Sequence, residues 1–343
     1  MTEQSSELFT LFDFEEPARG NMSAMAWEYL ACGAADEITL RWNRESFEQI
    51  KLNPRVLVDV AKLDTTVELL GQTLPFPILL APVGLQGLYH PEGEIAAVRG
   101  AGDAGATYVI SSYSTTTLEK ITAAASGPTW FQLYLQPERA FTKDLVQRAE
   151  AAGCKALCVT VDLPVLGVRN RMDRVRFAVP PDLSCPHMTK DFTGFPVTWD
   201  DVDWLMSFAK LPVLLKGILN PDDADIAVEH GVAGIIVSNH GARDLDSTPA
   251  TIEALPHVAD RIAGRIAVLM DGGIRRGTDV LKAIALGANS VLIGRPFAFG
   301  LGAAGSEGVT LVVDILRKEF EIAMALTGRP AISSIDRSVL WPA

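Results

Sequence analysis

Residues 234–246 read GIIVSNHGARDLD, an apolar run that ends in Ser238, Asn239 and His240 and is followed by Arg243. Histidine takes up a proton near neutral pH, and arginine holds a carboxylate with two parallel hydrogen bonds. A base beside an anion clamp indicates removal of a proton or hydride from a small organic acid. The alternative is a polar turn whose histidine only caps a helix, because a single motif is a hypothesis until its context agrees.

Short apolar runs bounded by glycine, proline or polar residues recur along the chain and predict strands that are covered on both faces. These runs are residues 78–82, 108–111, 129–134, 156–162, 213–217, 234–239, 267–272 and 290–295. Segments with helical periodicity lie between them, at residues 92–104, 138–152, 221–230, 251–262 and 276–286. Several of these segments end at a glycine suited to a left-handed cap, namely Gly105, Gly153, Gly231 and Gly287.

The alternation of strand and helix predicts an α/β fold, a (β/α)8 TIM barrel. A doubly wound open sheet is disfavoured because no GxGxxG motif follows the first strand. We expect residues 1–77 to form an N-terminal helical extension that packs on the barrel of residues 78–343. Within the extension, residues 21–32 are predicted as a helix and Val67–Leu69 as a small strand. Residues 169–200 separate the fourth strand from its helix, which predicts an irregular lid loop on the catalytic face.

The composition is that of an ordinary globular protein, with 48% hydrophobic and 21% charged residues in a chain of 343. The net charge of −12 argues against nucleic acid or an anionic membrane surface as a partner. The most apolar late stretch, residues 291–301, is interrupted by Arg295 and Pro296 and falls short of the roughly 18 residues that cross a bilayer. The acidic N-terminus is unlike a secretory or transit peptide. These features predict a soluble cytoplasmic protein that does not bind membranes.

The cysteines show no spacing typical of a metal site or a disulfide framework, so we expect neither. They are Cys32, Cys154, Cys158 and Cys185. Cys154 and Cys158 flank the start of a predicted strand, and we interpret both as small apolar residues.

Polar or ionisable side chains end most of the predicted strands, and the active site of a (β/α)8 barrel lies at those carboxyl ends. The residues at these positions are Ser111, Ser112, Gln132, Tyr134, Thr160, Asp162, Lys216, Ser238, His240 and Asp271. Taken singly, Lys216 could be a structural ion-pair partner and Asp162 a helix cap. A barrel without a site would not be expected to repeat the pattern this often.

The ends of the last two predicted strands carry a second kind of motif, which is typical of phosphate binding. DGGIRRG (271–277) and IGRP (293–296) place glycine N–H groups and arginines where such barrels bind phosphate. Glycine permits close approach of the backbone, and Arg275 or Arg295 would neutralise a dianion. Two turns with solvated arginines are the alternative, but their occurrence on adjacent strands favours a phosphorylated cofactor or substrate.

Together these motifs resemble one family, the FMN-dependent L-2-hydroxy acid oxidases and dehydrogenases. Its members include glycolate oxidase, lactate oxidase, lactate monooxygenase, mandelate dehydrogenase and the flavin domain of yeast lactate dehydrogenase. The resemblance extends over nearly the whole chain. It is carried by WEYLACGA (27–34), APVGLQ (81–86), QLY (132–134), TVDLPVLGVR (160–169), LKG (215–217), SNHGARDLD (238–246), DGGIRRGTDV (271–280) and IGRP.

The resemblance implies FMN as the cofactor and assigns roles to individual residues. His240 would be the base, and Asp162 would stabilise its protonated form. The residues implied in catalysis are His240, Asp162, Tyr134, Tyr29, Arg243 and Lys216. Those implied in substrate binding are Tyr29, Tyr134, Arg169, Arg243, Tyr113 and His240. Those implied in cofactor binding are Pro82, Val83, Gly84, Ser111, Gln132, Thr160, Lys216, Ser238, Asp271, Gly272, Gly273, Arg275, Gly294 and Arg295.

Three positions depart from the commonest pattern of the family. Asp244 stands where glutamine is frequent, and its charge could pair with Arg243 or point to solvent. Tyr113 replaces the tryptophan of glycolate oxidases near the substrate side chain. Gly84 lies beside the flavin N5, where oxidases commonly have alanine and dehydrogenases and the monooxygenase have glycine.

The wall of the substrate pocket is expected to be apolar, which favours acids of the size of lactate or larger over glycolate. It is expected to be formed by the lid together with Tyr113, Leu85 and Leu166. The lid segment has no apolar membrane-anchoring insertion like that of mandelate dehydrogenase.

The leading hypothesis is FMN-dependent oxidation of an L-2-hydroxy acid to the 2-oxo acid, with reoxidation by O2 giving H2O2, in a homotetramer implied by the resemblance. One alternative is a dehydrogenase that passes electrons to a quinone or protein acceptor, and another is a reaction like that of lactate monooxygenase. A more remote alternative is another FMN barrel such as isopentenyl diphosphate isomerase. A last alternative is a barrel without catalytic activity that serves only as a binding or scaffold module, and such a protein would not hold a yellow cofactor.

Overall fold

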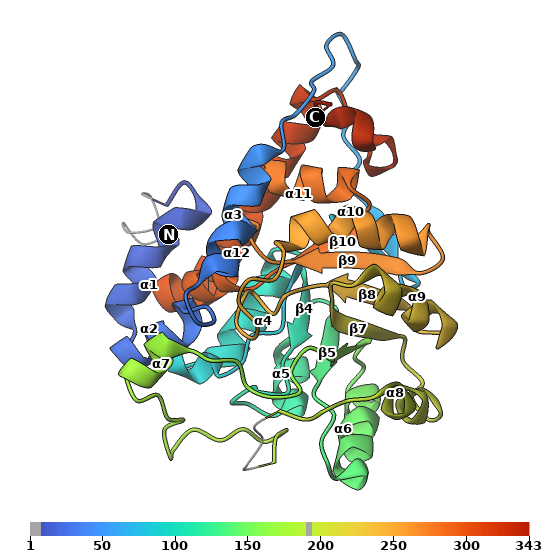
Figure 1. The fold of residues 1–343 in the computed structure, drawn as a ribbon. Coiled ribbons are helices and arrows are strands. Elements are labelled where there is room, and N and C mark those ends of the chain that lie inside the picture. Colours follow the sequence, from blue (N-terminus) through green and yellow to red (C-terminus); the bar gives the residue numbers. More distant parts are fainter. Residues whose placement is uncertain (1–7, 190–193, 343) are drawn as a thin grey trace.

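The computed structural model describes residues 8–189 and 194–342, in which eight parallel strands close a barrel (Figure 1). Each strand pairs with its neighbours in sequence, and the last pairs with the first, Val291 lying opposite Ile78. The predicted (β/α)8 architecture is therefore confirmed. The barrel strands are β3 (Ile78–Leu80), β4 (Thr107–Ile110), β5 (Thr129–Leu133), β6 (Leu157–Thr160), β7 (Val213–Ile218), β8 (Gly234–Val237), β9 (Ala267–Asp271) and β10 (Ser290–Ile293).

The strands read as continuous apolar runs because both of their faces are covered. Every residue of β3, β4, β5, β6 and β8 is buried. Leu79 belongs to an apolar cluster inside the barrel, whereas its neighbours Ile78 and Leu80 belong to the larger cluster shared with the helices. Alternate side chains therefore fill the barrel and support the helical layer.

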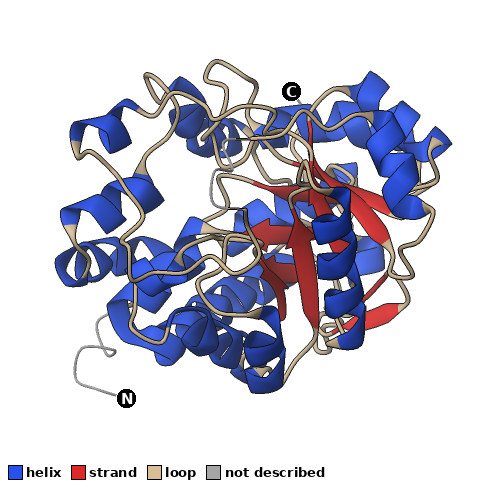
Figure 2. Cartoon of the chain, turned by 90° about the horizontal axis from the view of Figure 1, so that it is seen from below, coloured by secondary structure: helices blue, strands red, loops and turns tan. Residues whose placement is uncertain are grey.

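Helices surround the strands, as seen from below in Figure 2. They are α4 (Gly93–Asp103), α5 (Leu118–Ala124), α6 (Arg139–Ala151), α8 (Trp199–Met206), α9 (Pro221–Glu229), α10 (Thr251–Ile262), α11 (Gly277–Ala285) and α12 (Arg295–Leu326). All five helices predicted from periodicity are present. Gly105 and Gly231 take φ values of +75° and +74° directly after α4 and α9, as left-handed caps require.

From residue 8 onward, where its structure is described, the N-terminal extension has three α-helices that pack beside the barrel. They are α1 (Glu15–Asn21), α2 (Ala24–Ala31) and α3 (Ile38–Gln49). The prediction of a single helix over residues 21–32 is wrong at its start, because Asn21 ends α1 and Ser23 caps the next helix. The Ser23 hydroxyl accepts a hydrogen bond from the Ala26 N–H at 3.1 Å, which satisfies a donor at the beginning of α2.

A small antiparallel hairpin closes the amino-terminal end of the barrel. The predicted strand Val67–Leu69 is confirmed as β1, and it pairs with β2 (Gln72–Leu74). Leu69 and Leu74 join the apolar cluster inside the barrel, and the Trp130 indole N–H donates to Gln72 Oε1 at 3.4 Å. The opposite, carboxyl-terminal end of the strands stays available for a site.

The apolar stretch of residues 291–301 continues well beyond residue 301 as part of α12. The sequence alone did not lead us to expect this extension. By length and composition α12 could cross a bilayer, and it is the one such helix in the described part of the chain. However, 56% of its most apolar window is buried, and it packs on α1, α4 and α11. The helix is kinked where Ala304 and Gly305 leave helical geometry. It is a core helix of a globular protein.

The predicted lid, residues 169–200, is largely irregular but contains a short helix, α7 (Asn170–Arg174). Figure 1 shows α7 next to α2 of the extension. The Arg171 guanidinium forms ion pairs with Glu28 at 2.5 Å and with Glu37 at 3.1 Å, which fasten the lid to the extension. Part of the predicted lid, residues 190–193, lies outside the described residues.

Candidate active site

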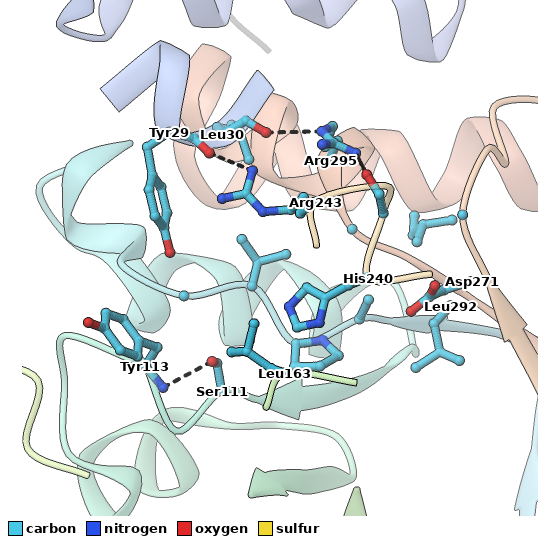
Figure 3. Close-up of a pocket in the computed structure, with 18 of the residues that line it drawn as sticks. Tyr29, Leu30, Ser111, Tyr113, Leu163, His240, Arg243, Asp271, Leu292 and Arg295 are labelled. Atoms are coloured by element: carbon cyan, nitrogen blue, oxygen red, sulfur yellow. Dashed lines mark hydrogen bonds between the residues drawn. The ribbon is translucent and has the colours of Figure 1, made fainter. Parts of the chain in front are cut away.

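A cavity of about 410 Å³ lies at the carboxyl ends of the barrel strands, below α2 and the lid. Most of the site residues predicted from sequence line it, although they come from elements spread over the whole chain. They are Tyr29, Pro82, Val83, Gly84, Ser111, Tyr113, Tyr134, Arg169, Lys216, His240, Arg243, Asp271, Gly272, Gly273, Arg275, Gly294 and Arg295. Figure 3 shows several of these side chains facing the cavity.

Four predicted residues lie behind the cavity wall, where they support residues that line it. Three of them, Gln132, Thr160 and Ser238, are buried. Gln132 Oε1 accepts from the Ser111 hydroxyl at 3.2 Å, and Gln132 Nε2 donates to the Thr160 hydroxyl at 3.0 Å. The fourth, Asp162, contacts the far side of the His240 ring. These four side chains orient the lining rather than form its surface.

His240 sits in a left-handed turn that directly follows β8. His240, Gly241 and Ala242 have φ values of +57°, +64° and +60°, a conformation that is costly for residues with a side chain. The turn is held by Asn239, whose side-chain oxygen accepts from the Ala242 N–H at 3.1 Å. Asn239 and Asn43 of α3 also exchange two amide hydrogen bonds, at 3.0 and 2.9 Å. The extension therefore fixes the turn that carries the predicted base.

Two carboxylates face the same nitrogen of His240. Nδ1 lies 2.9 Å from Asp162 Oδ1 and 3.0 Å from Asp244 Oδ2, while Nε2 lies 3.4 Å from the Tyr134 hydroxyl. Burial lowers the pKa of His240, but the charges of Asp244 and Asp162 outweigh it and raise that pKa to about 9. One nitrogen of the histidine and one oxygen of each acid lie within 4.8 Å of one another. The protonated ring supplies a positive charge that stabilises both carboxylates.

Asp244 does not pair with Arg243 and does not point to solvent, so both sequence-based expectations for it are wrong. Its Oδ1 accepts from Arg169 Nη2 at 2.9 Å, and its side chain is only 11% exposed. Arg243 instead donates through Nη1 to the backbone carbonyls of Tyr29 at 2.7 Å and Cys32 at 3.2 Å. The turn after β8 aims the side chains at positions 243 and 244 in different directions, which residue spacing does not reveal.

Lys216 of β7 is a buried cation with partners on two neighbouring strands. Its Nζ donates to the Ser238 hydroxyl at 3.0 Å and lies 3.3 Å from Asp271 Oδ2. Burial lowers the pKa of Lys216, but Asp271 and Asp162 outweigh it and hold the pKa above its ordinary value. The lysine therefore stays charged where β7, β8 and β9 end.

The model of one family, described as FMN-dependent dehydrogenase, matches residues 18–342. The chain is 47% identical to an L-lactate oxidase from Nostoc sp., over 99% of this chain and all of that one. It is 42% identical to glycolate oxidase from Spinacia oleracea, over 97% and 95% of the two chains.

Among solved structures, one of mandelate oxidase with (S)-2-phenylpropionate superposes with a TM-score of 0.92 at 41% identity, covering 97% of this chain and 98% of that one. The chain belongs to the FMN-dependent dehydrogenase family. Its cofactor is FMN, and its reaction class is the oxidation of a 2-hydroxy acid by a flavin-dependent oxidase.

The residues at one end of the cavity fit the phosphate of FMN. Arg275 donates to the Ile274 carbonyl. Arg295 donates to the carbonyls of Cys32 and Gly241, both at 2.8 Å, and to that of Leu30 at 3.0 Å, the last of which is drawn in Figure 3. Burial lowers the pKa of Arg295 to about 9 and that of Arg275 to about 10, and for Arg295 the nearby cations Arg243 and Arg275 add to the effect. Buried cations that repel one another need an anion, and a phosphate dianion supplies one.

Two glycines that line the cavity lie too close to neighbouring segments to be replaced by larger residues. A methyl group on Gly273 would lie 1.8 Å from the backbone oxygen of Asn43, and the φ of Gly273 is +79°. A methyl group on Gly84 would lie 2.8 Å from the Cβ of Tyr113 and 3.5 Å from the Tyr29 hydroxyl. In addition, Asp271 Oδ1 is buried with no partner among the described residues, which leaves an acceptor for a ligand.

The lid contributes apolar side chains to the wall of the cavity. The sequence predicted such a wall but did not identify Phe177 or Met172 as parts of it. Phe177 stacks on Tyr29 with ring centroids 4.7 Å apart, and Met172 and Leu163 also line the cavity. The expectation for Leu85 is wrong, because that side chain is fully buried away from the cavity. The residue types in the lid did not predict that Phe177 lines the cavity, because its contact with Tyr29 joins segments far apart in the chain.

Proposed function

We propose that this chain oxidises an L-2-hydroxy acid with an apolar side chain to the 2-oxo acid, and that O2 takes up the electrons and leaves as H2O2. The observation that carries the proposal is the convergence of His240, Arg243 and Arg169 on one cavity that also holds the buried cations Arg275 and Arg295. A base and two guanidinium groups suit an acid that is held by its carboxylate while it gives up a proton. The whole-length similarity to oxidases of 2-hydroxy acids supports the same reaction.

The proton is taken up by His240. FMN, when bound, would accept the two electrons and the second proton that leave the substrate. Only the neutral form of His240, which is the minor form below its raised pKa of about 9, accepts the proton, and it does so at Nε2 because Nδ1 donates to Asp162 at 2.9 Å. A carboxylate at Nδ1 fixes the orientation of the ring and stabilises its protonated form. Tyr134, 3.4 Å from Nε2, is placed to hydrogen-bond the substrate hydroxyl.

The carboxylate of the substrate is held by Arg243 and Arg169, with Tyr29 as a further donor. Arg169 uses Nε for the Arg243 carbonyl and Nη2 for Asp244, and an arginine has five N–H donors in total. Arg243 lies 5.0 Å from the centre of the Tyr29 ring, so the two side chains approach the ligand together. A two-arginine clamp orients the α-carbon and exposes one face of it, which explains selectivity for the L-enantiomer.

The side chain of the substrate would meet apolar groups and an aromatic lid. Leu163, Leu166, Met172, Phe177 and Tyr113 line the cavity on that side. Such a wall gains free energy from each buried methylene and gains little from glycolate, which has no side chain. We therefore favour L-lactate or larger apolar acids as substrates.

The flavin would be held along the strand ends. Lys216 is the cation for the pyrimidine edge, while Arg275 and Arg295 bind the phosphate. Ser111 would face the ring, with Gln132 and Thr160 behind it in a hydrogen-bonded chain. The remaining contacts would come from Pro82, Val83, Gly84, Asp271, Gly272, Gly273 and Gly294, while Ser238 would act from behind the wall as the partner of Lys216.

We further propose that residues 1–77 and 78–343 form one catalytic unit and that the enzyme works in the cytoplasm as a homotetramer. The first point is supported by Arg243 and Arg295, which both donate to carbonyls at the end of α2. A cavity that is walled by both parts of the chain cannot be complete without either of them.

An anaerobic titration of the purified yellow protein tests the proposal. Glycolate, L-lactate, longer 2-hydroxy acids and (S)-mandelate are added in turn while the flavin absorption is followed. We expect bleaching by L-lactate or a larger acid, and on admission of air one H2O2 for each acid oxidised. A bleached enzyme that air does not reoxidise, but an artificial acceptor does, would establish a dehydrogenase. Decarboxylated product without peroxide would establish a monooxygenase, and no bleaching by any acid would overturn the substrate assignment.

A further inference from the structure

Asp244 occupies a position between two charged groups of the candidate active site. Its Oδ1 accepts from Arg169 at 2.9 Å, and its Oδ2 lies 3.0 Å from His240 Nδ1. The backbone of Asp244 packs tightly on Gly167, where an added Cβ would lie 2.1 Å from the Asp244 carbonyl oxygen. The loop after β6 and the turn after β8 therefore hold this carboxylate in place.

Asp244 supplies one of the two carboxylates that face His240, and several cations surround them. His240 is faced by Asp162 from the loop after β6, Lys216 from β7, Tyr134 from the loop after β5 and Asp244 from its own turn. Two further cations are nearby. Arg169 is bound to the other oxygen of Asp244, and Arg243 belongs to the same turn. A cation close to an imidazole opposes its protonation, so an arginine placed to bind the substrate works against a nearby base.

We propose that Asp244 is a positioning residue that separates Arg169 from His240, neutralising the arginine and sharing with Asp162 the stabilisation of the protonated base. One carboxylate oxygen serves each neighbour, so a single side chain fixes the carboxylate clamp and the base at a set distance from each other. Because Nδ1 carries one hydrogen and shares it with Asp162 Oδ1, Asp244 Oδ2 acts on the same nitrogen through its charge. Their effects on the base are therefore coupled.

The inference rests on the proposed role of His240 as the base. The test is the pH profile of kcat/KM for the holoenzyme and for Asp244→Asn, with the best substrate found in the titration above. The acidic limb of this profile reports the pKa of the base in the free enzyme. Removing a negative charge 3.0 Å away lowers the pKa of His240, so the limb should move toward lower pH by about one unit. An increase in KM should accompany the shift, because Arg169 loses its partner.

Two further variants guard against a folding defect and an effect of net charge. Asp244→Gln is a second neutral variant, and it introduces the residue that is frequent here in the family. Asp223→Asn removes the same charge from the exposed first turn of α9 and should leave the limb in place. In the double variant of Asp162 and Asp244, the displacement of the limb should differ from the sum of the two single displacements.

A measurement independent of turnover is the NMR titration of His240 in the holoenzyme, assigned by its disappearance in His240→Gln. The pKa of this ring should fall in both neutral variants of Asp244. An unmoved limb and an unmoved ring pKa, with only KM increased, would overturn the inference and leave Asp244 as a partner of Arg169 alone. Normal turnover of His240→Gln would instead overturn the proposed function, so the two failures are distinguishable.

Discussion

Two groups of charged side chains in the cavity, the paired end and the cationic end, treat charge in opposite ways. At the paired end, Asp162 and Asp244 both face Nδ1 of His240, and Arg169 is paired with Asp244. At the other end, Arg275 and Arg295 donate to backbone carbonyls, and within the described residues neither forms an ion pair with a carboxylate. The pKa values of these two arginines are lowered, whereas that of His240 is raised.

This difference separates chemistry that the chain completes by itself from binding that a ligand must complete. The paired end holds its base and clamp in position before any substrate arrives, which is the arrangement that general-base catalysis needs. The cationic end keeps buried charges without countercharge, an unfavourable state that a bound phosphate relieves. Changes at the first end should therefore affect turnover, and changes at the second should affect retention of FMN.

The largest expected effect is that of His240→Gln on turnover. We expect kcat to fall about 10³-fold or more because the transition state loses its proton acceptor, while the flavin absorption of the purified protein is retained. Steady-state rates and the flavin spectrum provide the measurement. His257→Gln, on the exposed face of α10, serves as the matched control. A variant that turns over at a near-normal rate would remove His240 from the mechanism.

The cationic end predicts a strong preference for FMN over riboflavin, which lacks the phosphate. We expect the apoprotein to bind FMN at least about 100-fold more tightly, because charge-assisted hydrogen bonds to buried arginines are among the strongest. Arg275→Gln should reduce this ratio by weakening FMN and sparing riboflavin, as measured by fluorescence titration. The neighbouring Arg276→Gln is the control, since its side chain pairs with Glu319. Equal losses for both flavins in Arg275→Gln would place the phosphate elsewhere.

The clamp should respond to Arg243→Met with weaker binding of carboxylates. We expect the affinity for oxalate, measured by perturbation of the flavin spectrum, to fall about tenfold, because one bidentate partner is lost. The variant also loses hydrogen bonds to the carbonyls of Tyr29 and Cys32, so its melting temperature should decrease. FMN affinity is the internal reference and should change less than oxalate affinity. Unchanged oxalate affinity would contradict the clamp.

The smallest expected effect is on the pH dependence of the free energy of unfolding. His187 and His240 contribute to it with opposite signs. His187 of the lid is fully buried between the Ser114 hydroxyl and the Leu118 N–H, and burial lowers its pKa to about 4. Its stabilisation is present above pH 6.5 and is lost as the pH falls toward 4. That of His240, whose pKa is raised to about 9, is present below pH 6.5 and is lost as the pH rises through 9.

Urea unfolding across this pH range separates the two contributions. His187→Gln should flatten the decline in the free energy of unfolding on the acid side, and His240→Gln should flatten it on the alkaline side. The exposed His257→Gln should change neither limb. A decline on the acid side that survives in His187→Gln would show that carboxylates dominate it.

The barrel could be predicted because its signals are local. Each strand is a continuous apolar run, and the rule that sites lie at strand ends then brought Lys216, His240 and Asp271 together. The break at Ser23 was missed because a cap differs from a helix interior by one hydroxyl. The contacts of Asp244 and the stacking of Phe177 on Tyr29 were missed because they join distant segments. Leu85 is buried and has a left-handed backbone, with φ +55°, and no residue pattern predicted either feature.

The close approach of Gly84 to Tyr113 bears on how residues can be exchanged between relatives. An alanine at position 84 would press its methyl group to 2.8 Å from the Cβ of Tyr113, so that neighbour's backbone would have to move. Every residue other than glycine at position 113 keeps that Cβ, so the room at position 84 is set by the backbone at 113 and not by the type of side chain there. Exchanging both residues for those of an alanine-containing relative should therefore damage the enzyme as much as Gly84→Ala alone.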